Sequence, residues 1–166
     1  MRSRTLIGVA AVAAASLFAM SAGATASAQT ICTWGGTPAA PTGTFTLTPG
    51  VTNIPAPGPL RLKATGDLGG GEGCSGTVTF TGQANAGSTC PAISFEGTVK
   101  GLPGVTQFWG PGLFGVANEF LYDSAGNLVG VDQPQVLTQD NAPHFTDCLT
   151  PAGLTGGTFS STIELF

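Results

Sequence analysis

The segment Thr77-Val78-Thr79-Phe80-Thr81 alternates polar and apolar side chains residue by residue. Successive side chains of an extended strand point to opposite faces of a sheet, so this alternation is typical of a strand with one buried face. The same period of two recurs at residues 44–48, 60–64, 93–99 and 159–165. Gly, Pro, Ser and Thr interrupt every window in which a helical spacing of apolar residues would be visible. The chain is therefore predicted to be all-β and antiparallel.

One hairpin is predicted from local sequence, with strands at residues 119–122 and 128–131 around the turn Asp123-Ser124-Ala125-Gly126-Asn127. With about seven to nine strands expected, the predicted architecture is an antiparallel β-sandwich, for which an immunoglobulin-like arrangement is one option. The alternative is a small closed β-barrel. The proline-rich residues 49–59 and the glycine-rich residues 69–73 are predicted to be connections rather than strands.

Residues 1–28 have the pattern of a secretory signal peptide. Arg2 and Arg4 precede an uncharged, Ala-rich run, and Ala26-Ser27-Ala28 is a small-x-small motif of the kind that signal peptidase cleaves. The alternative is a retained membrane anchor, but the run is short against the roughly 20 strongly apolar residues of a span. We therefore predict a single secreted domain, residues 29–166, with no membrane span after cleavage.

The predicted mature chain contains an even number of cysteines, which in an oxidising compartment indicates two disulfides: Cys32, Cys74, Cys90 and Cys148. Four cysteines allow three pairings. If residues 75–81 and 91–99 form a hairpin, Cys74 lies at its open end and Cys90 near its turn, too far apart to bond at about 3.3 Å per residue. We therefore favour Cys32 with Cys74 and Cys90 with Cys148. The alternative, a zinc site, lacks a CxxC spacing, and no metal or other cofactor is predicted.

The charge of the predicted mature chain excludes one class of partner. Its basic residues are Arg61, Lys63 and Lys100, against nine Asp and Glu, which gives a net charge of 3 − 9 = −6. An acidic domain repels phosphate backbones and anionic lipid headgroups, so nucleic acid is not expected as a partner. Charged residues make up only 8% of the chain, where about a quarter is usual, so ion pairs are not expected to be the main stabiliser.

The sequence contains few of the residues that catalysis needs. His144 is the only histidine, and no serine lies in a G-x-S-x-G or S-x-x-K motif. His144 precedes Asp147 by three residues, and the pair is a candidate oriented base, although a loop histidine bonded to a nearby carboxylate is the simpler interpretation. Glycosidase-type chemistry, or a calcium site, would need acids that converge. Nothing in the sequence pairs the candidates, which are Glu96, Glu119, Asp123, Asp132, Asp140 and Asp147.

The segment at residues 101–115 is the strongest candidate for ligand binding. It combines Phe108, Trp109 and Phe114 with several glycines and prolines, a composition that suits a loop presenting aromatic side chains. Glycans, peptides and small aromatic molecules are all plausible ligands for such a surface. In the alternative interpretation, which we favour from sequence alone, Trp109 and Phe114 fold inward and fill one end of the domain. Trp34, beside Cys32, is predicted to be a core residue that packs on a disulfide.

Two sequence features carry a resemblance to known secreted proteins. The Ala-rich leader and the bias toward Gly, Thr, Ala and Pro resemble small secreted proteins of high-GC actinobacteria. The segment Ala39-Ala40-Pro41-Thr42, the alternating Thr and apolar residues after it, and the apolar C-terminal strand are similar to the neocarzinostatin-type apoproteins. That resemblance implies an immunoglobulin-like sandwich that sequesters an enediyne chromophore. Those proteins close two short disulfide loops, whereas the closest cysteines here are 16 residues apart.

These observations lead to two classes of function. The first is a secreted, non-enzymatic binding or surface-interaction module for an extracellular glycan, protein or other ligand, including a β-sandwich that sequesters a small molecule. The second is a secreted hydrolase that uses acidic residues with or without His144.

Overall fold

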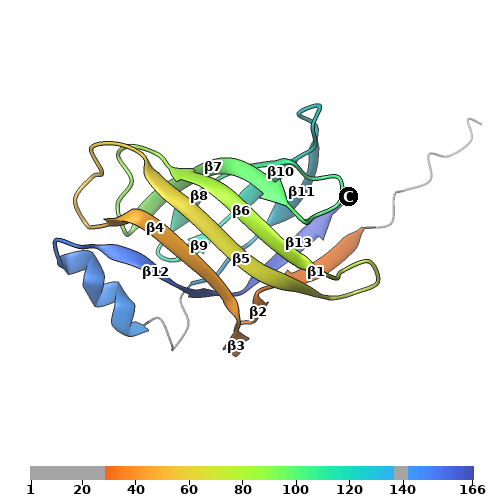
Figure 1. Ribbon diagram of the computed structural model, residues 1–166, viewed down its shortest axis with the longest axis horizontal. Coiled ribbons are helices and arrows are strands. Elements are labelled where there is room, and N and C mark those ends of the chain that lie inside the picture. Colours follow the sequence, from red (N-terminus) through yellow and green to blue (C-terminus); the bar gives the residue numbers. More distant parts are fainter. Residues whose placement is uncertain (1–28, 137–141) are drawn as a thin grey trace, which may run out of the picture.

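The computed structural model describes residues 29–136 and 142–166, without the side chains of residues 142–145. The predicted signal peptide lies outside the described residues. Eight antiparallel strands close into a barrel in the order β1, β13, β11, β10, β8, β7, β6, β5 and back to β1 (Figure 1). They are β1 (Thr30–Trp34), β5 (Leu60–Gly70), β6 (Thr77–Ala84), β7 (Ala92–Lys100), β8 (Gln107–Leu113), β10 (Glu119–Tyr122), β11 (Leu128–Asp132) and β13 (Ser161–Leu165).

The remaining elements lie beside this barrel. They are β2 (Gly36–Thr37), β3 (Ala40–Pro41), β4 (Gly43–Val51), β9 (Val116–Ala117), β12 (Leu154–Phe159) and the 3-10 helix η1 (Ala142–Leu149). Strand β4 pairs with β5 and β12 pairs with β4, so these two strands widen the sheet on one side. None of the helices in the described part of the chain has the length and hydropathy needed to cross a bilayer.

The sheet divides along β5, where one strand changes partners. Residues 61–65 of β5 pair with β4, and residues 68–70 pair with β1. Gly66 lies between the two pairings, where a Cβ atom would come within 3.0 Å of Gly35 and of the Trp34 indole nitrogen. The Trp34 Nε1 donates a hydrogen bond to the Gly66 carbonyl at 3.0 Å. Glycine therefore lets β1 approach β5 closely at the point where the barrel closes.

The half of the barrel next to β4 and β12 is closed by isolated β-bridges rather than by a continuous ladder of paired residues. Gln135 bridges to Val116 of β9 on one side and to Ser160 on the other. Ser160 separates β12 from β13, so this bridge joins the β8–β9 hairpin to the β12 side of the sheet. The interior in this half is therefore bounded by β4, β5, β7, β8, β9 and β12.

An aromatic cluster fills the centre of the barrel. Trp34 stacks on Phe80 with ring centroids 4.4 Å apart and meets Phe159 edge-on at 4.5 Å. Phe80 in turn packs against Phe108 with ring centroids 4.8 Å apart. All four side chains are buried. Burial of Phe80 and Phe159 was predicted by the period-two alternation and that of Trp34 by its position beside Cys32, whereas Phe108 was predicted to lie in a loop. These rings supply much of the apolar burial that stabilises the domain.

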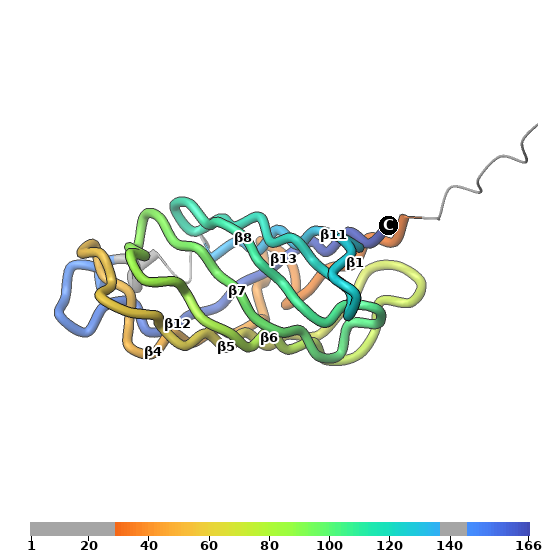
Figure 2. Tube along the Cα trace, turned by 90° about the horizontal axis from the view of Figure 1, so that it is seen from above, coloured from red at the N-terminus to blue at the C-terminus, as the bar shows by residue number. Residues whose placement is uncertain are grey.

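The all-β antiparallel prediction is confirmed, and the architecture is the alternative one, the closed barrel. Figure 2 shows that the barrel is flattened, with β5 and β6 on one side and β8, β11 and β13 on the other. Alternation of polar and apolar residues describes one buried face in a sandwich and in a barrel alike. What closes the barrel is the pairing of β1 with both β5 and β13, which alternation does not encode.

Several local predictions can be compared with the structure. The 119–122/128–131 hairpin is confirmed as β10 and β11. Residues 49–51 belong to β4 and residues 69–70 to β5, so the two predicted connections are shorter than expected. The predicted strand at 159–165 is divided at Ser160. Residues 107–113, predicted as part of a loop, form β8. The residues Phe108, Gly110 and Gly112 occupy the buried positions of this alternating strand.

Both favoured disulfides are present. Cys32 bonds to Cys74 and Cys90 to Cys148, with Cα–Cα distances of 5.5 Å and 6.1 Å. The hairpin used to exclude a Cys74–Cys90 bond exists as β6 and β7. The second disulfide attaches η1 to the segment that leads into β7, and the Asn53 amide donates to the Cys148 carbonyl at 3.2 Å. The connection after β4, the helix and the start of β7 are thereby held together.

Candidate functional site

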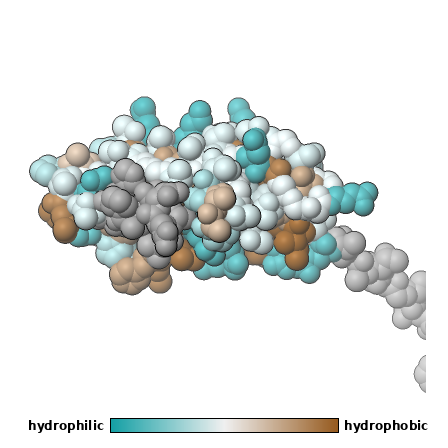
Figure 3. Space-filling view, turned by 90° about the horizontal axis from the view of Figure 1, so that it is seen from below, coloured by the Kyte–Doolittle hydropathy of each residue, from teal (hydrophilic) through white to brown (hydrophobic). Residues whose placement is uncertain are grey.

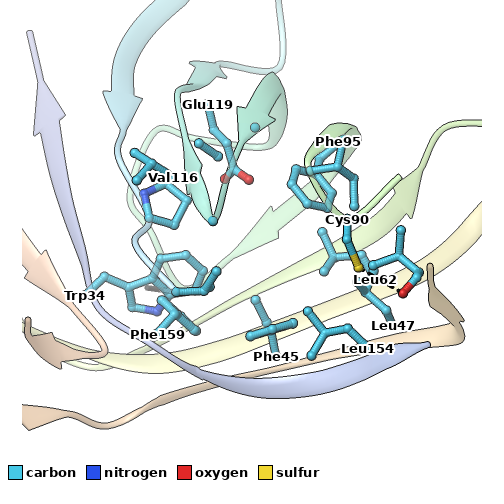
Figure 4. Close-up of a pocket in the computed structure, with 18 residues that line it drawn as sticks. Trp34, Phe45, Leu47, Leu62, Cys90, Phe95, Val116, Glu119, Leu154 and Phe159 are labelled. Atoms are coloured by element: carbon cyan, nitrogen blue, oxygen red, sulfur yellow. Dashed lines mark hydrogen bonds between the residues drawn. The ribbon is translucent and has the colours of Figure 1, made fainter. Parts of the chain in front are cut away.

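An apolar cavity of about 100 Å³ lies inside the half of the barrel that β4 and β12 complete. Its wall comes from strands on every side of this half, as Figure 4 shows. Leu47 and Leu62 come from β4 and β5, Phe95 from β7, and Leu154 and Phe159 from β12. Gly112 of β8 also lines the cavity, and its lack of a side chain leaves room that a larger residue would occupy.

The turn between β8 and β9 lies at the boundary between this cavity and solvent. Gly115 and Val116 line the cavity, while the Phe114 side chain is 70% exposed. Phe114 and Gly115 both have positive φ angles, 49° and 79°, as a two-residue type I′ hairpin turn requires. A bulky side chain rarely adopts this conformation. The Phe114 amide donates to the Pro91 carbonyl at 3.0 Å, and the Val136 amide donates to the Gly115 carbonyl at 2.8 Å, so the turn is fixed on two sides.

One acidic side chain points into the cavity. Glu119 begins β10, is 5% exposed, and directs its carboxyl group toward the space between the apolar side chains (Figure 4). No hydrogen bond to this carboxyl group is formed by the residues that the structure describes. A buried carboxyl group without a partner is costly, and such groups are concentrated at functional sites.

A second buried acid faces Glu119. Asp132 of β11 is its cross-strand partner and is fully buried. The Ser161 hydroxyl donates to Asp132 Oδ1. Asp132 Oδ2 and the buried Ser160 hydroxyl have no hydrogen-bond partner among the described residues. The interior therefore holds two neighbouring carboxyl groups and too few donors for them.

Burial controls the protonation of this pair. Burial raises the pKa of Asp132 to about 7, although the Ser161 hydroxyl and the Gln133 amide act in the opposite direction. Burial also raises the pKa of Glu119 well above its usual value, and the charge of Asp132 raises it further. Asp132 therefore ionises first, and its negative charge keeps the proton on Glu119.

No basic side chain of the described residues reaches this pair. Arg61, Lys63 and Lys100 are all exposed, and each lies at an outward position of its strand. The negative charge that develops on the acid pair is therefore not compensated by a cation of residues 29–136 or 146–166.

The predicted aromatic residues are placed in three different environments. Phe108 lies in the core and is 2% exposed. Trp109 is 45% exposed and stacks on Phe120 with ring centroids 5.9 Å apart. Phe114 lies at the tip of the β8–β9 turn. The expectation that Trp109 and Phe114 fold inward is wrong, because both occupy outward or turn positions of the β8–β9 hairpin.

Trp109 lies in a shallow hollow on the outer face of β6, β7, β8 and β10. Polar side chains surround it, including Gln107 and the cross-strand neighbour Glu96. The Gln83 amide nitrogen donates to Glu96 Oε1 at 2.8 Å, which fixes both groups beside the indole. In the space-filling view of Figure 3, which shows the molecule from below, apolar residues form separate patches on a mostly hydrophilic or neutral surface.

The other predicted candidates lie elsewhere, and some of them lie outside the described residues. The His144 backbone belongs to η1, but its side chain lies outside the described residues, as does Asp140. Asp123 accepts hydrogen bonds from the amides of Ala125 and Asn127 at 2.8 Å and 2.9 Å, which confirms it as the turn residue of its hairpin. Within residues 29–136 and 146–166, no three His, Cys, Asp or Glu side chains converge as a metal site would require.

In the sequence, Glu119 and Asp132 are candidates only by residue type, and no motif pairs them. A usable signal was present, because the predicted hairpin places Glu119 in phase with Leu121, on the buried face. The hairpin register then sets Asp132 opposite Glu119. Comparison with protein-family models, curated proteins and solved structures found no match to this chain.

Proposed function

We propose that this protein is a secreted binding protein that sequesters a small apolar molecule in the cavity of its barrel. The observation that carries the proposal is the apolar cavity of about 100 Å³ with one carboxyl group, that of Glu119, directed into it. Ligand sites commonly combine apolar walls with a few placed polar groups that fix orientation. The two disulfides are consistent with an oxidising, extracellular environment.

The cavity has an energetic cost that binding would offset. At roughly 24 cal/mol per Å³, an empty cavity of about 100 Å³ lowers stability by about 2 kcal/mol relative to a filled core. Apolar cavities of this order of size stay dry and take up small aromatic molecules. Because rigid strands rather than loops form most of the wall, the site is preformed, and a ligand would bind without large rearrangement.

Filling the cavity from Gly112 tests the proposal. A Cβ atom at this position would lie 3.0 Å from the Ile93 side chain and 3.3 Å from the Ala117 side chain, within the cavity wall. We expect the wild-type protein to bind toluene, measured as a ligand-dependent rise in Tm and as NMR shifts of cavity methyl groups. We expect Gly112→Val to weaken toluene binding at least about tenfold, which corresponds to about 1.4 kcal/mol.

The matched control is Gly58→Val, since a Cβ atom at Gly58 meets no neighbour within 4 Å. This control should bind toluene like the wild type. If toluene bound the wild type and Gly112→Val equally well, the cavity would not be the binding site.

The outer face supports a second candidate function, the binding of a neutral glycan at Trp109. The observation that favours it is the half-exposed indole, supported by Phe120 and flanked by hydrogen-bonding groups of Gln83, Glu96 and Gln107. A flat aromatic face and fixed amide and carboxylate groups suit the apolar and hydroxyl surfaces of a sugar ring. A glycan array should show binding that Trp109→Ala abolishes and Phe114→Ala leaves unchanged. A glycan that binds both variants equally would exclude this surface.

A further inference from the structure

We infer that the molecule bound in the cavity carries a protonated amine beside its apolar body, and that Glu119 holds this amine. The inference rests on the proposed function, because it names the class of ligand for the same cavity. It depends on three features of the interior: a carboxyl group aimed into an apolar space, a second carboxyl group directly behind it, and the absence of a basic partner among the described residues.

The geometry leaves Glu119 available to a ligand. Its carboxyl group lines the cavity and has no hydrogen-bond partner among the described residues, whereas Asp132 already accepts a bond from Ser161. Asp132 Oδ2 nevertheless has no donor from the part of the chain that the structure describes. An ammonium group brings three donors and a positive charge into the place where both are lacking. In a low-dielectric interior the attraction between opposite charges a few ångströms apart is much stronger than in water.

The same interior disfavours the other ligand classes. An anionic head group would meet Asp132, so like charges would approach in an apolar environment. A neutral alcohol would satisfy one hydrogen bond but would leave the charge of the acid pair uncompensated. A purely apolar molecule would fill the cavity and bury the Glu119 carboxyl group without any partner.

The inference implies that binding displaces a proton. Burial and the charge of Asp132 raise the pKa of Glu119 well above its usual value and so favour its protonated form in the free protein, and a cationic ligand would bind together with loss of that proton to the solvent. Asp132 is the only titratable side chain that faces Glu119 from the neighbouring strand β11. Strands β8, β9 and β12 contain no titratable side chain. On β13, Glu164 pairs with Val131, which is one residue out of phase with Asp132, so the Glu164 side chain points to the outer face. Affinity for the amine should therefore rise with pH while the amine itself stays protonated.

Three probes of similar shape test the inference: benzylamine, benzyl alcohol and toluene. Isothermal titration calorimetry at pH 8 should give at least about tenfold tighter binding for benzylamine than for the two neutral probes. Repeating the benzylamine titration in buffers of different ionisation enthalpy should show release of a proton on binding. This measurement needs no variant, so it does not depend on how well a mutant folds.

The variant Glu119→Gln keeps the shape of the side chain and removes its charge. We expect it to lose at least about tenfold in benzylamine affinity and to bind toluene no more weakly than the wild type does. Equal affinity of the wild type for all three probes, or benzylamine binding without proton release, would overturn the inference but leave the proposed function intact. Failure of all three probes to bind would overturn both.

Discussion

Glu119 and Asp132 form a buried acid pair, and their protonation links folding to pH. In the unfolded chain both carboxyl groups have pKa values near 4. In the folded chain burial raises the pKa of Asp132 to about 7 and raises that of Glu119 well above its usual value. The folded state therefore binds more protons than the unfolded state above pH 4 or so. The stability that these protons confer is complete below about pH 4 and is lost as the pH rises through about 7.

We accordingly predict that Tm falls between pH 5 and pH 8. Circular dichroism of thermal unfolding at several pH values measures this fall. The variant Asp132→Asn should flatten the dependence, because its side chain cannot ionise, and Asp67→Asn on the exposed face of β5 is the control. A Tm that stays constant over this range in the wild type, or a fall of equal size in Asp132→Asn, would contradict the prediction.

At the scale of single residues, the sequence identified the burial of Trp34 and the turn role of Asp123, because both follow from local pattern. It did not identify the partner of each acid. Pairing of Glu119 with Asp132 requires the register of the hairpin as well as its existence. The proximity of Ser161 to Asp132 requires in addition the position of β13 beside β11.

Among the elements, the β8–β9 hairpin connects the cavity to the surface. Gly110 and Gly112 occupy inward positions of β8, and Phe114 occupies the left-handed position of the turn. In the sequence alone these glycines indicate a loop, since glycine is depleted in strands. In the structure Gly112 lines the cavity, and its missing side chain leaves room inside the barrel, so a residue that obscured the strand helps to create the cavity. At Gly110 the missing side chain instead lets the backbone of Asn118 and Glu119 approach closely.

The turn of this hairpin yields a stability prediction. A non-glycine residue in the left-handed region costs about 1 kcal/mol, and Asn tolerates that conformation better than Phe does. Since the Phe114 side chain is largely exposed, Phe114→Asn should raise the free energy of unfolding by about 1 kcal/mol, as measured in urea. Leu113→Asn, at an exposed position of the same hairpin, should give no such gain.

The same variant tests whether Phe114 takes part in binding. If its ring contributes to the mouth of the cavity, Phe114→Asn should bind toluene more weakly while being more stable, a trade-off found at functional positions. A variant less stable than the wild type would show that the Phe114 ring packs favourably and that the turn is not strained.

In the molecule as a whole, strand content and disulfide pairing were predictable, whereas the closure of the sheet into a barrel was not. Each strand is a local pattern, and the hairpin of β6 and β7 was enough to exclude one cysteine pairing. Closure depends on contacts between the two ends of the described chain, since β1 pairs with β13 and with β5. A cavity arises only when the strands enclose a volume that their side chains do not fill. No local pattern in the sequence reports that difference between volumes.

The pairing of Thr30 with Leu165 places the two ends of the described chain side by side, away from η1 and β12 in Figure 1. A short linker could therefore join them, and new ends could be opened in the exposed turn at residues 123–127 with little disturbance of the ladder. A tether at Phe166 would lie at this same end, away from the β8–β9 turn that separates the cavity from solvent. Immobilised on a sensor surface through that residue, the barrel would present its binding chamber to the solution.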